Sequence, residues 1–94
     1  MVEAPNKQIF AVIALKNAPA LAAKIRDMEL TSLSLTDDSW LAVYGGTTRE
    51  FAEALGIRSG EIGVAGLVVP VENYSGRASS DVWEWLKVNW TANG

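Results

Sequence analysis

The sequence lacks two residue types that carry much of enzyme chemistry, because it contains no cysteine and no histidine. Without cysteine the chain has no disulfides, no thiolate zinc ligands and no thiol nucleophile. Without histidine it lacks the commonest general base and the commonest metal ligand. We therefore expect no catalytic residues, no metal site and no cofactor, and a protein that is not an enzyme.

Long apolar runs and clusters of positive charge are also missing. The apolar run Ile9–Leu15 ends at Lys16, well short of the roughly 18 residues that a membrane-spanning helix needs. The formal net charge is −3, and the eight basic residues are scattered along the chain. These features predict no membrane partner, a cytoplasmic location and little affinity for nucleic acid.

What is present is a composition typical of one folded domain, with 94 residues of which 49% are hydrophobic. We expect residues 1–8 to form a flexible lead-in and residues 9–94 a single α+β domain. The run Ile9–Leu15 predicts a central strand covered on both faces. Asn17 and Pro19 then provide the start signals of a helix over residues Ala18–Met28.

The rest of the chain alternates strands and helices. Leu33 and Leu35 alternate with polar residues, which predicts an edge strand that turns at residues 36–39 into a third strand, residues 40–44. Thr47 and Glu50 have capping-box spacing at the start of a second helix, and Gly56 is placed to end it. Residues 64–71 form a strand that Pro70 assigns to a sheet edge, and residues 82–90 form a last helix.

This order predicts a ferredoxin-like βαββαβ sandwich, strand order 4-1-3-2, with an added C-terminal helix. A three-stranded βαβαβ unit, in which residues 30–36 are a loop, is the alternative. Because the first strand is apolar on both sides, its second sheet face needs a cover. Either the last helix or a second copy of the chain provides that cover, and the second choice predicts a homodimer.

Two loops contain residues suited to anion binding. The first candidate site follows the third strand, where paired glycines, hydroxyls and a cation precede a helix. We expect the first and third strands to be parallel, which would bring residues from the end of the first strand to the same place. The candidate residues are Lys16, Asn17, Gly45, Gly46, Thr47, Thr48 and Arg49.

The second loop precedes the last helix, with Ser79 or Ser80 as its cap and Gly76 at a positive φ. Its Arg77 can bind an anion, although we favour an ion pair between Arg77 and Asp37 or Asp38 in the hairpin turn. The candidate residues of this loop are Tyr74, Ser75, Gly76, Arg77, Ser79 and Ser80.

The last helix carries three tryptophans. Trp83 and Trp90 share one helical side, whereas Trp85 points elsewhere, so all three are candidate interface residues. Packing of all three on the sheet is the alternative and the favoured interpretation.

The segments Asp38–Leu41 and Val82–Lys87, with the order of elements, resemble small ferredoxin-like proteins related to the CRISPR adaptation nuclease and the VapD ribonuclease toxins. The resemblance implies dimerisation through the sheets. The nucleases of that group carry a metal-binding aspartate near the end of the first strand, where this chain has the segment Ile13–Asn17 without an acid. Metal-dependent nuclease activity is therefore the least favoured function.

Our leading expectation is a non-enzymatic, homo-oligomeric interaction or regulatory module, with another protein as a further possible partner. A small-anion or nucleotide-binding protein that uses the two glycine-containing loops is the alternative.

Overall fold

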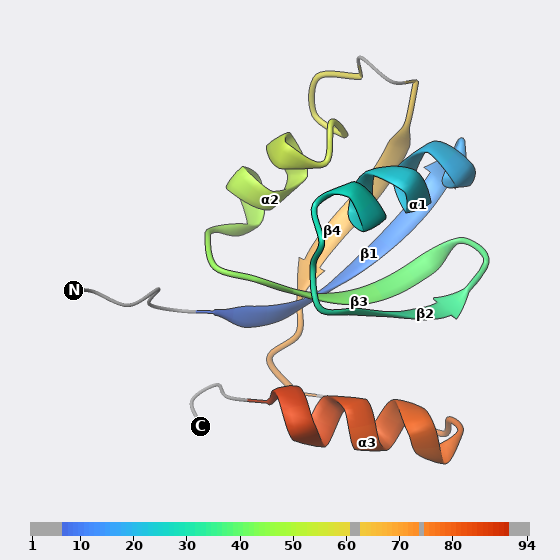
Figure 1. Cartoon of the computed structure of the whole chain (residues 1–94), viewed down its shortest axis with the longest axis vertical. Helices are drawn as coiled ribbons and strands as arrows, with labels where there is room; N and C mark the ends of the chain where they lie inside the picture. Colours follow the sequence, from blue (N-terminus) through green and yellow to red (C-terminus); the bar gives the residue numbers. More distant parts are fainter. Residues whose placement is uncertain (1–6, 61–62, 74, 91–94) are drawn as a thin grey trace.

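The computed structural model describes residues 7–60, 63–73 and 75–90, which fold into an α+β domain of three layers. A four-stranded antiparallel sheet forms the middle layer, with two helices on one face and one helix on the other (Figure 1). The elements in chain order are β1 (Gln8–Lys16), α1 (Ala18–Asp27), β2 (Ser32–Thr36), β3 (Ser39–Tyr44), α2 (Thr48–Ala54), β4 (Ala65–Pro70) and α3 (Ser80–Asn89).

The strands lie in the order β2-β3-β1-β4. The prediction that β1 and β3 are central and that β2 and β4 form the edges is thus confirmed. The three-stranded alternative is wrong, because Leu33 pairs with Leu41 and residues 32–36 form a full edge strand. Pairing gives the short segment a partner for its backbone groups, which a loop would leave to solvent.

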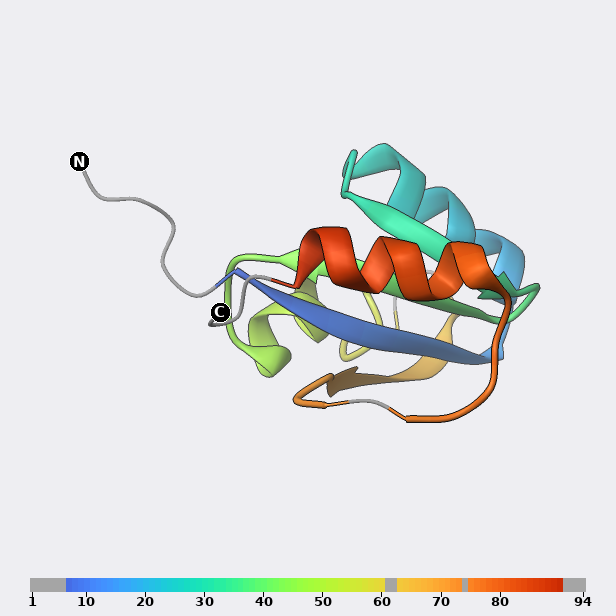
Figure 2. The same cartoon turned by 90° about the horizontal axis from the view of Figure 1, so that it is seen from below.

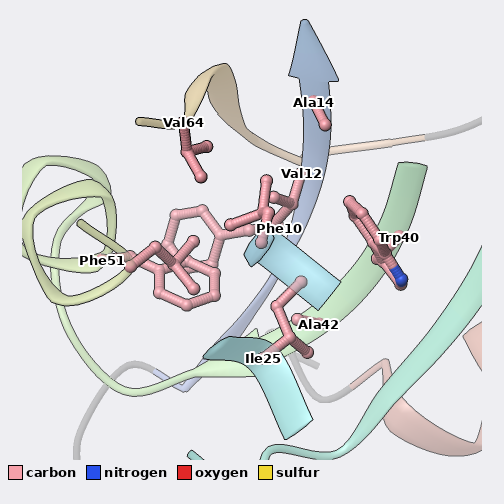
Figure 3. Packing of buried hydrophobic residues seen from close by; sticks show 10 residues of the cluster. Phe10, Val12, Ala14, Ile25, Trp40, Ala42, Phe51 and Val64 are labelled. Atoms are coloured by element: carbon pink, nitrogen blue, oxygen red, sulfur yellow. The ribbon is translucent and has the colours of Figure 1, made fainter. Parts of the chain in front are cut away.

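The core between the sheet and the first two helices is apolar and closely packed (Figure 3). Phe10 and Val12 of β1 are fully buried there, and the ring of Phe51 from α2 packs edge-on against Phe10 with centroids 5.2 Å apart. Tyr44 at the end of β3 stacks on Phe51 at 4.3 Å. These three rings connect β1, β3 and α2.

Local signals set the ends of the first two helices. The helix predicted to begin at Ala18 does so, with Pro19 in its first turn and Met28 as its C-cap. Gly56 adopts φ 82 after α2, and its amide and that of Ile57 donate to carbonyls of the last helical turn. This is the arrangement that favours glycine at a helix end, so the predicted C-terminal cap is confirmed.

The second face of the sheet is covered by α3, which crosses it from the end near the β2–β3 turn back toward the start of β1 (Figure 2). Leu86 is buried against Ile9 of β1 and Leu41 of β3 in a second apolar cluster. Alternate residues of a strand point to opposite faces, so β1 contributes Phe10 to one cluster and Ile9 to the other. The prediction that the first strand is covered on both faces is confirmed, and this chain's own helix supplies the cover.

Candidate functional site

The first predicted anion site is divided between opposite ends of the sheet. β1 and β3 are antiparallel, with Gln8 opposite Tyr44 and Ile13 opposite Ser39. The expectation of parallel first and third strands is wrong, because α1 returns the chain so that β2 runs along β1, and the β2–β3 turn then reverses it. Lys16 and Asn17 therefore lie at one end of the sheet, and residues 45–49 lie at the other.

The turn from Gly45 to Arg49 is occupied by its own capping interactions. The Thr47 backbone N–H donates to Glu50 Oε1 at 2.9 Å, and the Glu50 backbone N–H donates to Thr47 Oγ1 at 3.0 Å. A Cβ on Gly46 would lie 2.7 Å from that same Oε1 and 2.7 Å from the Tyr44 ring, so a side chain at this position would displace the Glu50 carboxylate and the Tyr44 ring. The start of α2 already holds a carboxylate, which would repel a bound anion.

The remaining residues of this predicted site belong to helix ends, a strand end and a surface ion pair. Thr48 is the first residue of α2, and Arg49 forms an exposed ion pair with Glu53 at 3.7 Å. Arg58 approaches the same carboxylate at 3.6 Å. Asn17 is the N-cap of α1 in a left-handed conformation, φ 61, and Lys16 ends β1. The structure therefore does not bring the seven predicted residues together.

The second predicted loop lies before α3, and its Tyr74 is outside the described residues. Gly76 has φ 150, as predicted, and Ser79 is the N-cap of α3. Within the described ranges, Arg77 forms no ion pair with Asp37 or Asp38, so the favoured pairing is wrong. Ser75, Gly76, Arg77, Ser79 and Ser80 are all exposed.

One polar contact in this loop perturbs an ionisable group. The Ser79 hydroxyl donates to Asp81 Oδ1 at 2.6 Å. This hydrogen bond is the main reason that the pKa of Asp81 lies below its ordinary value, and a bond from the Asp81 backbone amide adds to the effect. Because the Ser79 hydroxyl points at a carboxylate, it is engaged within the helix start.

The three tryptophans of the last helix all pack against the sheet. Trp83, Trp85 and Trp90 are half-buried around the cluster of Ile9, Leu41 and Leu86. The indole N–H of Trp83 also donates to the Ala78 carbonyl at 3.1 Å. Packing on the sheet, the favoured interpretation, is thus confirmed, and Trp85 does not point away. Its ring is large enough to reach the sheet from the flank of the helix.

The cover that α3 provides stops short of β4. Leu67 and Val69 of β4 share the face that carries α3, since they pair with Ile13 and Ala11, and they are 52% and 44% exposed. Leu15, at an irregularity of the β1–β4 pairing, is 67% exposed. Apolar side chains that adjoin along one strand form a patch that favours contact with another protein surface.

The outer edge of β4 adds backbone groups that make no hydrogen bond with another described residue of the chain. The Val71 N–H donates to the Ile9 carbonyl at 2.9 Å, so residues 71, 69 and 67 direct their backbone groups toward β1. Gly66, Val68 and Pro70 then direct theirs outward. Pro70 has no N–H, and it occupies a position where none is needed by the sheet. We name Leu67 and Val69, together with the outer edge of residues 65–70, the β4 surface.

A sequence signal for the β4 surface exists, although it does not by itself indicate a function. Pro70 correctly assigned the strand to an edge, and Leu67, Val68 and Val69 form an apolar run beside it. Whether such a run is covered depends on the position of α3 over the sheet, and the local sequence does not predict that position.

The described part of the chain offers no metal centre and no membrane span. In residues 7–60, 63–73 and 75–90, no three acidic side chains come together in a group that could hold a metal ion. Across the same residues, no helix has the length and apolar character needed to span a membrane. The chain matches no protein-family model, no curated protein and no solved structure.

Proposed function

We propose that this chain is a ferredoxin-like interaction or regulatory module that works in the cytoplasm as a homo-oligomer. The strand order supports the fold assignment, because β2-β3-β1-β4 becomes β4-β1-β3-β2 when it is read from the opposite edge. The helices α1 and α2 lie on one face, as that fold requires, and α3 is the addition (Figure 1).

The observation that carries the proposal is the β4 surface. An edge strand offers unpaired N–H and C=O groups to any other strand, and proteins protect such edges with charged side chains, proline, bulges or a covering segment. Of these, β4 has a proline at its last residue, Pro70. β4 has no charged residue between Ala65 and Pro70, and it exposes Leu67 and Val69 beside the free edge. A surface of this kind favours association with a protein over binding of a small anion.

The alternative of anion binding required the end of β1 to lie beside the turn that precedes α2, and these two segments lie at opposite ends of the sheet. Lys16 is far along the sheet from the capping box, and the capping box already contains the Glu50 carboxylate. No contact in the described part of the chain favours a ligand at either glycine-containing loop, so self-association is the better supported function.

The test of the proposal is the solution mass of the intact chain. Light scattering over a concentration series up to about 1 mM would detect an association as weak as about −4 kcal/mol. The proposal predicts a mass that rises from 10.1 kDa toward twice that value. A mass of one chain across the whole series would overturn it.

A further inference from the structure

We propose that two copies of the chain join edge to edge through β4, in antiparallel pairing around a twofold axis at Val68. This inference rests on the self-association proposed above and names its surface. The two four-stranded sheets would then form one continuous sheet, with β4 of each copy at its centre.

Hydrogen-bond geometry selects this pairing. Gly66 and Val68 each direct an N–H and a C=O outward, and Pro70 directs only a C=O outward. With the axis at Val68, the two Val68 residues exchange two hydrogen bonds. The N–H of each Gly66 also donates to the Pro70 carbonyl of the other copy. Pro70 has no N–H to donate in return, so the Gly66 carbonyl is the one outward-directed group of these three residues that gains no partner.

Side chains agree with the same register. Leu67 of one copy lies opposite Val69 of the other, and the twofold axis repeats this pair. Both residues point to the face that carries α3, and both are about half exposed in the single chain. Opposite residues in such non-hydrogen-bonded positions approach most closely, so the pairing covers the two exposed apolar side chains of β4 with each other.

Charge complementarity favours a second copy as the occupant. Each chain carries a net charge of −3, but β4 itself is uncharged, so no like charges meet along the pairing. Lys16 lies opposite Ala65 at the start of β4, and the exposed Glu72 follows its end. Antiparallel pairing brings Glu72 of each copy toward the end of the other copy's sheet at which Lys16 of β1 lies.

The opposite edge of the sheet is less suited to this role. β2 presents serine and threonine side chains, and the Ser34 hydroxyl donates to the carbonyl of Thr36 at 3.1 Å. The β2–β3 pairing is irregular between the same two residues, and the extra residue, Leu35, belongs to β2 itself. In the β1–β4 pairing the extra residue is Leu15 of β1, so β4 has no bulge. An irregular polar edge is a common protection against strand addition.

A contact of one short strand per copy is small. Stable interfaces bury about 1,200–2,000 Å² in total, so pairing of six residues per chain predicts weak, concentration-dependent association. We expect a dissociation constant in the micromolar range or above.

The decisive experiment uses two single variants, Leu67→Glu and Val69→Lys, measured alone and as an equal mixture by light scattering. Each variant alone places two charges against apolar side chains, so we expect its dissociation constant to rise at least about tenfold. In a heterodimer of the two variants, the introduced glutamate of one copy lies opposite the introduced lysine of the other, and the second Leu67–Val69 pair is unchanged. The mixture should therefore recover the mass that each variant alone has lost.

Leu35→Glu is the matched control, because Leu35 is an exposed leucine on the other edge strand. It should leave the association unchanged, and urea unfolding of all variants should show that the fold is retained. If both single variants associate like the unaltered chain, the β4 inference is wrong although self-association stands. If the mixture stays dissociated, the proposed register is wrong. If the unaltered chain is a monomer, both proposals fail.

Discussion

Replacement of Leu86 by alanine tests the role of α3 as the cover of the second sheet face. Leu86 is 4% exposed and contacts the apolar cluster that contains Ile9 and Leu41. Replacement of leucine by alanine removes the Cγ atom and the two Cδ atoms. At about 0.8 kcal/mol per buried carbon, their loss removes about 2.4 kcal/mol of transfer free energy. α3 is a single helix on an open sheet face and can move toward it, so the cavity adds little, and we expect a total loss of about 2–3 kcal/mol.

Urea unfolding followed by far-UV circular dichroism measures this loss. With a slope of about 1 kcal/mol per molar urea, which suits a small domain, the midpoint should fall by about 2 M. Val88→Ala is the control on the same helix, since Val88 is 75% exposed, and it should change the free energy of unfolding by less than about 0.5 kcal/mol.

The reasoning is refuted if Leu86→Ala and Val88→Ala have equal effects. Equal and small effects would mean that α3 does not rest on the sheet in solution and that the second face is covered by something else. A transition at low urea that removes only helical signal would mean that α3 opens separately from the sheet, in which case the expected loss applies to that first step.

Three further changes test local features. Gly66→Ala should destabilise the fold by about 1–3 kcal/mol in thermal unfolding, because the new Cβ would lie 2.5 Å from the backbone carbonyl oxygen of Ile13. The backbone fixes the position of a Cβ, so a side-chain rotation cannot relieve this contact. An unchanged midpoint of thermal unfolding would contradict that packing. Thr47→Ala removes the hydroxyl acceptor of the α2 capping box and should cost about 1 kcal/mol by the same assay, whereas a neutral result would show that water replaces it. Ser79→Ala should raise the pKa of Asp81 toward its ordinary value in an NMR titration of the carboxyl carbon. The stabilising contribution of this hydrogen bond is present above the ordinary carboxyl pKa and is lost as the pH falls through the lowered one, and an unmoved pKa would contradict its assigned cause.

Several features of the fold follow from short stretches of sequence. Thr47 and Glu50 form the capping box that their spacing predicts, since both partners lie within one helical turn. Gly56 ends α2 because only a residue that tolerates positive φ fits there. Pro70 marks an edge strand because its missing N–H excludes a central position. Each of these predictions depends on interactions within a few residues, which the local sequence contains completely.

Two predictions about the candidate sites depended on relations between distant segments, and both were wrong. The first anion site required β1 and β3 to be parallel, but strand direction is set by the whole path through α1 and the β2–β3 turn. The pairing of Arg77 with Asp37 or Asp38 required a loop and a turn at the same end of the sheet to meet. Opposite charges at one end of a molecule form an ion pair only when the backbone brings them within a few ångströms.

The amino-acid sequence by itself determined that β1 is buried on both faces, because Ile9–Leu15 contains no polar residue that could face water. It also determined that the chain has neither the imidazole nor the thiol on which much of catalysis depends. Only the tertiary structure decided what covers β1 and what remains uncovered. α3 buries Ile9 and Leu41 but leaves Leu67 and Val69 of β4 half exposed, because one helix is too narrow to cover a four-stranded sheet.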